Sequence, residues 1–282
     1  MAESTLIFGD EQHLIATLTH PEAGSPAPTW VAVLTNSGVI PRMGPHRMNV
    51  RLARQFAKAG IPSIRFDLSG LGDSRRASGS RPVVEQWVED TRMAMDVAQR
   101  QWGPVKFFMI GFCSGAEVAH LTALSDSRLQ AAVLWDFYSY PTPQAKVHQL
   151  IYRVRRAGVQ GMVNKITKKM FGEDDAKRRE PPPDDGLQGM TSGPVTPKNV
   201  YAQRFQKLVD QGVELFFYYS GGEPEWYAYR NQFFDIFQGH DFVQKVSFDQ
   251  LAVSDHLITS KAAQEGFSLA VHDWLAKRIM AK

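Results

Sequence analysis

The feature that most constrains the fold of this chain is a regular alternation of short apolar runs and longer amphipathic segments. Four runs are rich in apolar residues and have the length of strands: Trp30–Leu34, Ile61–Phe66, Val105–Ile110 and Leu129–Trp135. Three segments with helical spacing separate them: Met48–Lys58, Val83–Gln101 and Ala116–Leu124. Strands without polar alternation, separated by helices, are typical of a parallel sheet covered on both faces. The alternation therefore predicts an α/β fold.

The same pattern extends to both ends of the chain. Two short alternating stretches, Thr5–Phe8 and Leu14–Leu18, predict an antiparallel pair. The alternation is completed near the other end of the chain. There we expect a strand at Val213–Tyr219, a segment of helical spacing over Trp226–Phe237, a strand at Phe242–Phe248 and a final helix over Ser260–Lys277.

Residues 140–212 interrupt the alternation. This stretch is helical in spacing, rich in basic residues, and contains three consecutive prolines, Pro181-Pro182-Pro183. We expect an inserted helical cap over residues 140–212, with the α/β core formed by residues 1–139 and 213–282. The basic residues of the cap are interpreted first as a solvated helix face.

Composition excludes several classes of protein. The single cysteine rules out an intramolecular disulfide and argues strongly against a cysteine-based structural zinc site. No metal and no cofactor are expected. A net charge of +3 is too small for nucleic acid to be the main partner. No apolar run reaches the roughly 18 residues of a membrane span, and the N-terminus lacks a signal-peptide pattern. We therefore expect a cytoplasmic protein.

The chemistry centres on Gly111-Phe112-Cys113-Ser114-Gly115, which follows an apolar strand and precedes a helix. This is the context of a nucleophile elbow, in which the central residue sits on a sharp turn and the flanking glycines permit it. The helix N-terminus favours a thiolate and a developing oxyanion. Cys113 is therefore the predicted nucleophile. Two alternatives are a buried structural cysteine and Ser114 as nucleophile, although Ser114 is off the centre of the elbow and should point away.

A nucleophile of this kind needs a base from a loop after the last strand. His256, in the sequence Val253-Ser254-Asp255-His256, has that position between the last predicted strand and the final helix. His46 follows the Trp30–Leu34 strand and His120 lies on the helix after the elbow, so both have a weaker claim. We therefore assign the base to His256.

A third group must orient the imidazole. The order nucleophile, acid, histidine predicts a carboxylate after the strand Val213–Tyr219, and Glu223 is the first choice there. Glu225 is a neighbouring candidate. Asp136, directly after the strand Leu129–Trp135, is the alternative from the adjacent strand.

An oxyanion hole needs two backbone N–H donors. One is expected from Ser114, the residue after the nucleophile. The other is expected from the turn after Trp30–Leu34, at Gly38 and Val39, where glycine permits a close backbone approach. The alternative is an ordinary strand-end turn.

Two further motifs carry a family resemblance. Asn36–Arg47 and Arg65–Ser74 resemble the N-x-G-x-x-x-R-x-G-P-x-R and R-F-D-L-S-G-x-G-D-S patterns of bacterial α/β-hydrolases. Over nearly its whole length the chain looks like a member of that superfamily, similar to exosortase-associated and natural-product-cluster hydrolases. The resemblance implies an eight-stranded, mostly parallel sheet with helices on both faces. Asp67 and Asp73, within the second motif, are interpreted as residues that fix the loop.

The chain departs from the family pattern at three places. Cys113 replaces the usual serine, as in dienelactone hydrolases; the acid is Glu223 instead of aspartate; and Ser37-Gly38 replaces the His-Gly of the oxyanion loop.

The resemblance and the residues together imply an enzyme that cleaves an acyl ester or thioester through an acyl-cysteine. A thiolate exchanges with a thioester at little energetic cost, so coenzyme A or a carrier protein is an expected acyl carrier. One alternative is an acyltransferase that passes the acyl group to an amine or alcohol. A second alternative is a non-catalytic binding protein of the same fold. The oligomeric state is not encoded in these patterns.

Overall fold

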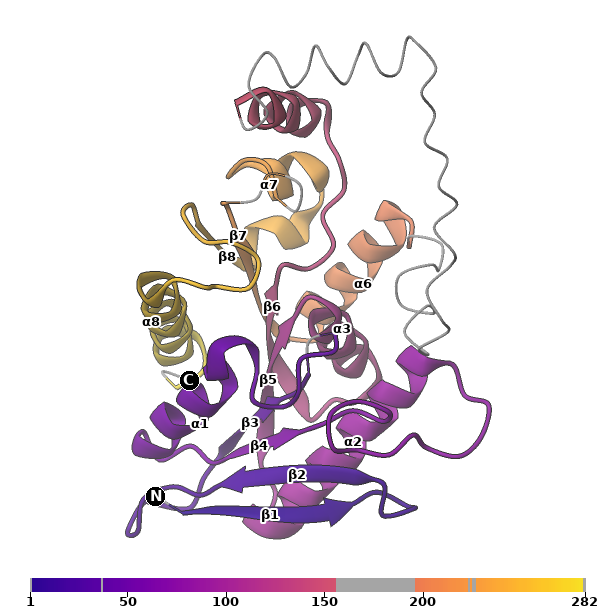
Figure 1. Cartoon of the computed structure of the whole chain (residues 1–282), viewed down its shortest axis with the longest axis vertical. Helices are drawn as coiled ribbons and strands as arrows, with labels where there is room; N and C mark the ends of the chain where they lie inside the picture. The colour runs from indigo at the N-terminus through magenta and orange to yellow at the C-terminus, as the bar shows by residue number, and fades with distance from the viewer. Residues whose placement is uncertain (1, 37, 156–195, 223, 225–226, 281–282) are drawn as a thin grey trace.

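An eight-stranded sheet forms the centre of the molecule in the computed structural model, which describes residues 2–36, 38–155, 196–222, 224 and 227–280 (Figure 1). The strands lie in the order β1-β2-β4-β3-β5-β6-β7-β8. Their bounds are β1 Glu3–Phe8, β2 Leu14–Thr19, β3 Trp30–Leu34, β4 Ser63–Phe66, β5 Lys106–Phe112, β6 Leu129–Trp135, β7 Glu214–Ser220 and β8 Ser247–Leu251. The first two strands pair antiparallel, β2 joins β4 antiparallel, and all further neighbours are parallel. The predicted fold class is confirmed.

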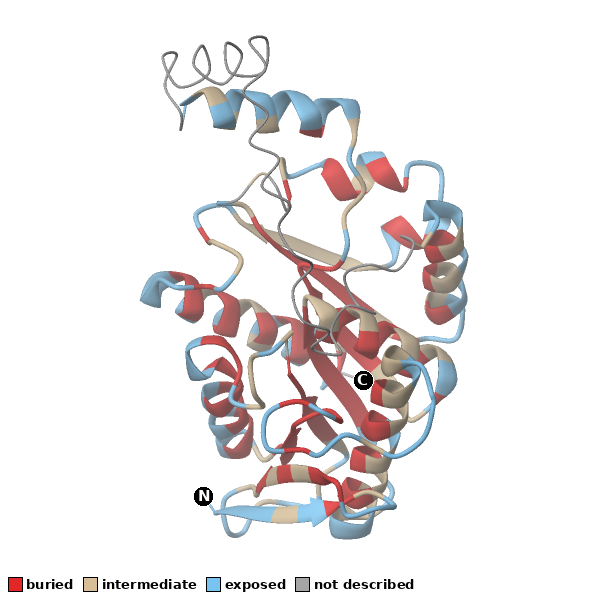
Figure 2. Cartoon of the chain, turned by 45° about the vertical axis from the view of Figure 1, so that its right-hand side comes forward, coloured by how far each residue is buried: buried red, intermediate tan, exposed pale blue. Residues whose placement is uncertain are grey.

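Helices cover both faces of this sheet. Figure 1 shows α1 (Met48–Lys58) and α8 (Lys261–Arg278) on one side, and α2 (Val83–Trp102), α3 (Ser114–Ser125) and α6 (Lys198–Asp210) on the other. Figure 2 shows the central strands as the most continuously buried part of the chain. Since both faces are covered, these strands carry apolar side chains at successive positions and not at alternate ones.

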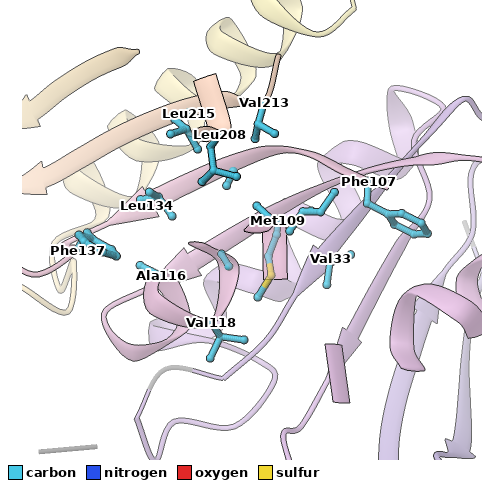
Figure 3. Packing of buried hydrophobic residues seen from close by; sticks show 14 of the residues in the cluster. Val33, Phe107, Met109, Ala116, Val118, Leu134, Phe137, Leu208, Val213 and Leu215 are labelled. Carbon is cyan, nitrogen blue, oxygen red and sulfur yellow. The ribbon is translucent and has the colours of Figure 1, made fainter. Parts of the chain in front are cut away.

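Each face of the sheet has its own apolar core. Under α1 and α8, Phe56 packs edge-on against Phe108, and Trp135 lies against Phe267 with ring centroids 4.4 Å apart. The core under α2, α3 and α6 includes Met109, Leu134 and Leu208, which Figure 3 shows among the side chains of this cluster. Complete burial of such a side chain contributes about 1.5–3 kcal/mol, so these two layers fix the strand ends that carry the site.

The last strand is not where the apolar pattern placed it. Residues Phe242–Phe248 were expected to form it, but Asp241–Gln244 is a 3-10 helix, η2, and β8 begins at Ser247. Phe242 and Val243 are buried in the core as part of that short helix. The real strand, Ser-Phe-Asp-Gln-Leu, lies at the edge of the sheet and all five of its residues are half-buried, so it lacks the apolar run of a central strand.

The expected cap, residues 140–212, contains segments of different kinds. Its last helix, α6, lies on the sheet and buries Tyr201, Phe205 and Leu208 in the core. Residues 143–155 are helical, and Figure 1 shows them beyond the carboxyl ends of the strands, next to α7 (Gln232–Ile236). The remainder of the expected cap, residues 156–195, lies outside the described residues. No helix in the described part of the chain combines the length and apolar character that crossing a membrane requires.

Candidate active site

Cys113 occupies the turn between β5 and α3. Its backbone has φ +53° and ψ −114°, a conformation that costs energy for any residue with a side chain and that recurs at functional sites. A Cβ on Gly111 would lie 2.2 Å from the carbonyl oxygen of Gly115, and a Cβ on Gly115 would lie 2.7 Å from the carbonyl oxygen of Asn36. Both flanking positions therefore require glycine, and together they force Cys113 to the tip of a tight elbow.

His256 lies beside this elbow, in the loop between β8 and α8. Its ring packs against Phe112, with centroids 4.6 Å apart, and its side chain is 14% exposed. Nδ1 is 2.7 Å from Oδ2 of Asp136, so Nδ1 carries the proton shared with the carboxylate and Nε2 is left for the thiol of Cys113. Burial acts to lower the pKa of His256, but hydrogen bonds to Asp136 and to Cys113 outweigh burial and raise that pKa to about 9.

Asp136 is the first residue after β6, and its side chain is only 1% exposed. Its backbone adopts φ +47°, and its N–H donates to the carbonyl of Tyr218 at 2.8 Å, which turns the carboxylate toward His256. Ser220, the last residue of β7, donates to this carboxylate from both its backbone N–H and its hydroxyl, each at 2.7 Å. With His256, three donors satisfy the buried charge, as a buried carboxylate requires.

The sequence favoured Glu223 as the acid, with Glu225 beside it. Both glutamates lie outside the described residues. The position at Nδ1 of His256 is instead held by Asp136, the alternative from the adjacent strand. Asp136 reaches His256 because β6 neighbours the elbow strand β5, whereas β7 is one strand further away.

The turn after β3 approaches the elbow from the other side. Gly38 has φ +51°, a backbone conformation that glycine adopts without strain, and its N–H donates to Oγ of Ser114 at 2.8 Å. The hydroxyl of Ser114 therefore contacts the turn that was predicted to supply the second oxyanion donor. Val39 is 65% exposed beside it. The two predicted donor segments thus meet, with the Gly38 N–H already directed at a side chain.

A buried polar network holds this turn in place. Asn36 donates to the buried carboxylate of Asp67 at 2.9 Å and accepts from the N–H of Leu68 at 2.6 Å. Arg42 also binds Asp67 through its backbone N–H and its guanidinium, and reaches Asp73 at 2.7 Å. Asp67 therefore faces the loop and not the imidazole, in agreement with the loop-fixing interpretation of both aspartates.

Metal ligands do not gather anywhere in the part of the chain that the structure describes: no three histidine, cysteine, aspartate or glutamate side chains converge there. The side chains and backbone groups brought together at the elbow are a thiol, an imidazole, a carboxylate and N–H donors. Such a set is suited to nucleophilic attack on a carbonyl.

Comparison with known proteins agrees with this architecture. A family described as serine aminopeptidase, S33, matches residues 39–174, a span that includes the elbow and Asp136 and ends before His256. No curated protein matches the chain. Among solved structures, an α/β serine hydrolase without a lid from Xanthomonas campestris has a TM-score of 0.58 at 14% identity and covers 98% of this chain and 94% of its own. The chain has the α/β-hydrolase fold.

Two other solved structures are similarly distant in sequence. An esterase from Pyrococcus furiosus has a TM-score of 0.62 at 13% identity, over 99% of this chain and 91% of its own. Proline iminopeptidase from Mycobacterium smegmatis has a TM-score of 0.58 at 15% identity, over 99% of both chains. At such identities the shared property is the fold, so the specific resemblance to exosortase-associated hydrolases stays a prediction.

Proposed function

We propose that this chain is an enzyme that cleaves an acyl ester or thioester through a covalent acyl-cysteine on Cys113. His256 is the base and then the acid, and Asp136 orients the imidazole and stabilises its protonated form. The observation that carries this proposal is the 2.7 Å contact between Oδ2 of Asp136 and Nδ1 of His256, whose ring packs against Phe112, the residue next to Cys113 in the elbow. Nucleophile, base and orienting acid are the arrangement that covalent acyl chemistry uses on unrelated folds.

The reaction proceeds in two halves. Sγ of Cys113 attacks the acyl carbonyl as a thiolate, with the thiol proton held on Nε2 of His256. The tetrahedral intermediate collapses, the bond to the leaving alcohol or thiol breaks, and His256 returns the proton to that leaving group. A water molecule then attacks the acyl-cysteine, His256 takes the water proton, and the free acid leaves as the thiol is restored.

The cysteine favours thioesters over oxoesters as donors. Attack of a thiolate on a thioester exchanges one thioester for another and is close to thermoneutral. Attack on an oxoester must form a thioester of higher energy. An acyl group carried on coenzyme A or on a carrier protein is therefore the donor best matched to Cys113.

Exposed apolar side chains that neighbour the catalytic groups in the sequence favour an apolar acyl group. Val253 and Leu257 flank His256 in sequence and are 81% and 44% exposed. Val39 adjoins Gly38, and Tyr138 follows Asp136 by two residues; both are also exposed. Exposed apolar side chains at these positions in the chain support an apolar acyl group as the substrate.

Acyl transfer is the second candidate, and the same cysteine favours it. An acyl-cysteine is more open to amines than an acyl-serine, so an amine or alcohol can compete with water for the intermediate. Transfer requires the acceptor to be held at the acyl carbon.

Steady-state kinetics on matched donors test the proposed function. Thioesters and oxoesters of the same acyl chain are supplied to the wild-type protein and to Cys113→Ala. We expect turnover of thioesters at a higher kcat/KM than oxoesters, and no turnover by Cys113→Ala. Full activity in Cys113→Ala would contradict the assignment, and absence of turnover on every donor would favour a binding protein of this fold.

A further inference from the structure

The hydroxyl of Ser114 contacts the turn that is expected to supply an oxyanion donor. Ser114 directly follows the nucleophile, and its N–H is the expected first oxyanion donor. Its Oγ accepts the N–H of Gly38 at 2.8 Å, across 76 residues of sequence. While this bond exists, the Gly38 N–H is directed at Ser114 and not at a substrate oxygen.

This contact belongs to a closely packed part of the molecule. A Cβ on Gly115, the next residue of α3, would lie 2.7 Å from the carbonyl oxygen of Asn36, so the helix and the turn are in backbone contact. Asn36 is buried and is bound to Asp67 and Leu68. The turn that carries Gly38 is therefore fixed next to α3, by the close approach of Asn36 to Gly115 and by the hydrogen bonds of the Asn36 side chain.

We propose that the Ser114 hydroxyl is itself an oxyanion donor, polarised by the Gly38 N–H that it accepts. A hydroxyl has one proton to donate and two lone pairs to accept with, so accepting from Gly38 leaves its own proton for the substrate. The Gly38 dipole strengthens that donation, because hydrogen bonds in a chain polarise one another. The inference rests on the proposed function, since it assigns a role in the same reaction.

The oxyanion then has two donors from a single residue. The negative charge that forms on the carbonyl oxygen accepts from the N–H and from Oγ–H of Ser114, and both bonds weaken again when the intermediate collapses. No proton is transferred, so the balance of the reaction is unchanged. Gly38 acts through Ser114 and does not touch the substrate in this arrangement.

The competing role is that the hydroxyl merely occupies the place of the oxyanion in the resting enzyme. In that case its removal frees the Gly38 N–H for the substrate, and turnover stays the same or rises. The two roles therefore predict opposite effects of Ser114→Ala.

The test compares Ser114→Ala with Ser114→Thr, which keeps a hydroxyl, and with Ser125→Ala at the far end of the same helix. The donor is one acyl thioester, and kcat and KM are measured separately. The rate of alkylation of Cys113 by iodoacetamide is measured alongside, because that displacement forms no oxyanion.

We expect Ser114→Ala to lower kcat by about 100-fold, the usual effect of losing one oxyanion donor, with KM and the alkylation rate little changed. The kcat of Ser114→Thr should be at least about tenfold higher than that of Ser114→Ala. Ser125→Ala should have the kcat of the wild type. Unchanged or faster turnover in Ser114→Ala overturns the inference, as does a parallel loss of alkylation, which would mark a structural role. Failure of the proposed function is distinguishable from failure of this inference, because it shows in the wild-type protein. A wild-type protein that is alkylated by iodoacetamide but accepts no acyl group contradicts the proposed function, whatever the Ser114 variants do.

Discussion

Oδ2 of Asp136 lies 2.7 Å from Nδ1 of His256, although 120 residues separate them in the chain. The two residues meet because β6, which ends just before Asp136, is the immediate neighbour of the elbow strand β5. The loop after β8 brings His256 to the same edge of the sheet. Asp136, the alternative that the sequence offered, therefore contacts His256 from the strand next to the elbow strand.

The first prediction separates the two acids. Asp136→Asn should lower kcat on the order of 100-fold or more, because the imidazole loses the charge that orients it and stabilises its protonated form. Glu223→Gln is the matched control and should change kcat by less than about fivefold. Steady-state kinetics on one acyl thioester decides between them. A larger loss of kcat in Glu223→Gln than in Asp136→Asn would mean that the acid lies in the loop after β7.

The second prediction concerns the protonation of His256. Its pKa is raised to about 9 from an ordinary value of 6.5, since hydrogen bonds to Asp136 and Cys113 outweigh burial. The protonated form thus favours the folded state; this contribution is complete below about pH 6.5 and is lost as the pH rises through 9. The free energy of unfolding in urea should fall more steeply over this interval in the wild type than in His256→Gln.

The same shift has a spectroscopic signature. Asp136→Asn removes the partner at Nδ1, so the pKa of His256 should move down, as burial then acts with less opposition. Titration of the His256 ring signals by NMR measures this directly. An identical titration in the wild type and Asp136→Asn would mean that the carboxylate does not act on the imidazole.

The third prediction concerns Ser220, which positions Asp136 from β7. Its hydroxyl donates to the buried carboxylate at 2.7 Å, and a hydrogen bond to a charged group contributes about 1.5–3 kcal/mol. Ser220→Ala should lower kcat about tenfold and shift the pH profile, because the carboxylate is less firmly held. Ser220→Thr, which keeps the hydroxyl, should recover part of the loss. If Ser220→Ala and Ser220→Thr both lower stability to the same extent and leave kcat and the pH profile unchanged, Ser220 has only a structural role.

The fourth prediction concerns the fate of the acyl group. With one acyl thioester and a panel of amines and alcohols, conjugate should form at the expense of free acid as the acceptor concentration rises. Cys113→Ser should shift the products toward free acid or stop at a stable acyl-serine, because an oxoester is a poorer donor to amines. Free acid alone, at a rate that no acceptor changes, would leave hydrolysis as the whole reaction.

Much of the fold was predictable because the central strands are apolar at successive positions. Trp30–Leu34 and Leu129–Trp135 are observed with the predicted bounds, and so is the helix Met48–Lys58. The edge strand β8 was predicted at the wrong position, because an edge strand is only half covered and does not require an apolar run. The buried apolar side chains of Phe242 and Val243 belong instead to a 3-10 helix.

The site was predictable where local chain geometry determines it. The glycines flank Cys113 in the sequence, so Cys113 could be assigned to the turn from its sequence neighbours alone. The contact that excludes a side chain at Gly111 lies within the elbow, whereas the contact at Gly115 is with Asn36. The partner of His256 depends on which of two adjacent strand ends reaches the imidazole, and on the left-handed backbone of Asp136. No local pattern in the sequence encodes that choice. The contact between Gly38 and Ser114 is of the same kind, because it joins segments 76 residues apart.

The central claim is that an acyl group is carried on Cys113. Intact-mass spectrometry after brief incubation with an acyl thioester tests it most directly, with peptide mapping to locate the adduct. The account predicts an added mass equal to the acyl group on Cys113 in the wild type, a longer-lived adduct in Asp136→Asn, and no adduct in Cys113→Ala. An adduct at another residue, or turnover in Cys113→Ala at the wild-type rate, would contradict it.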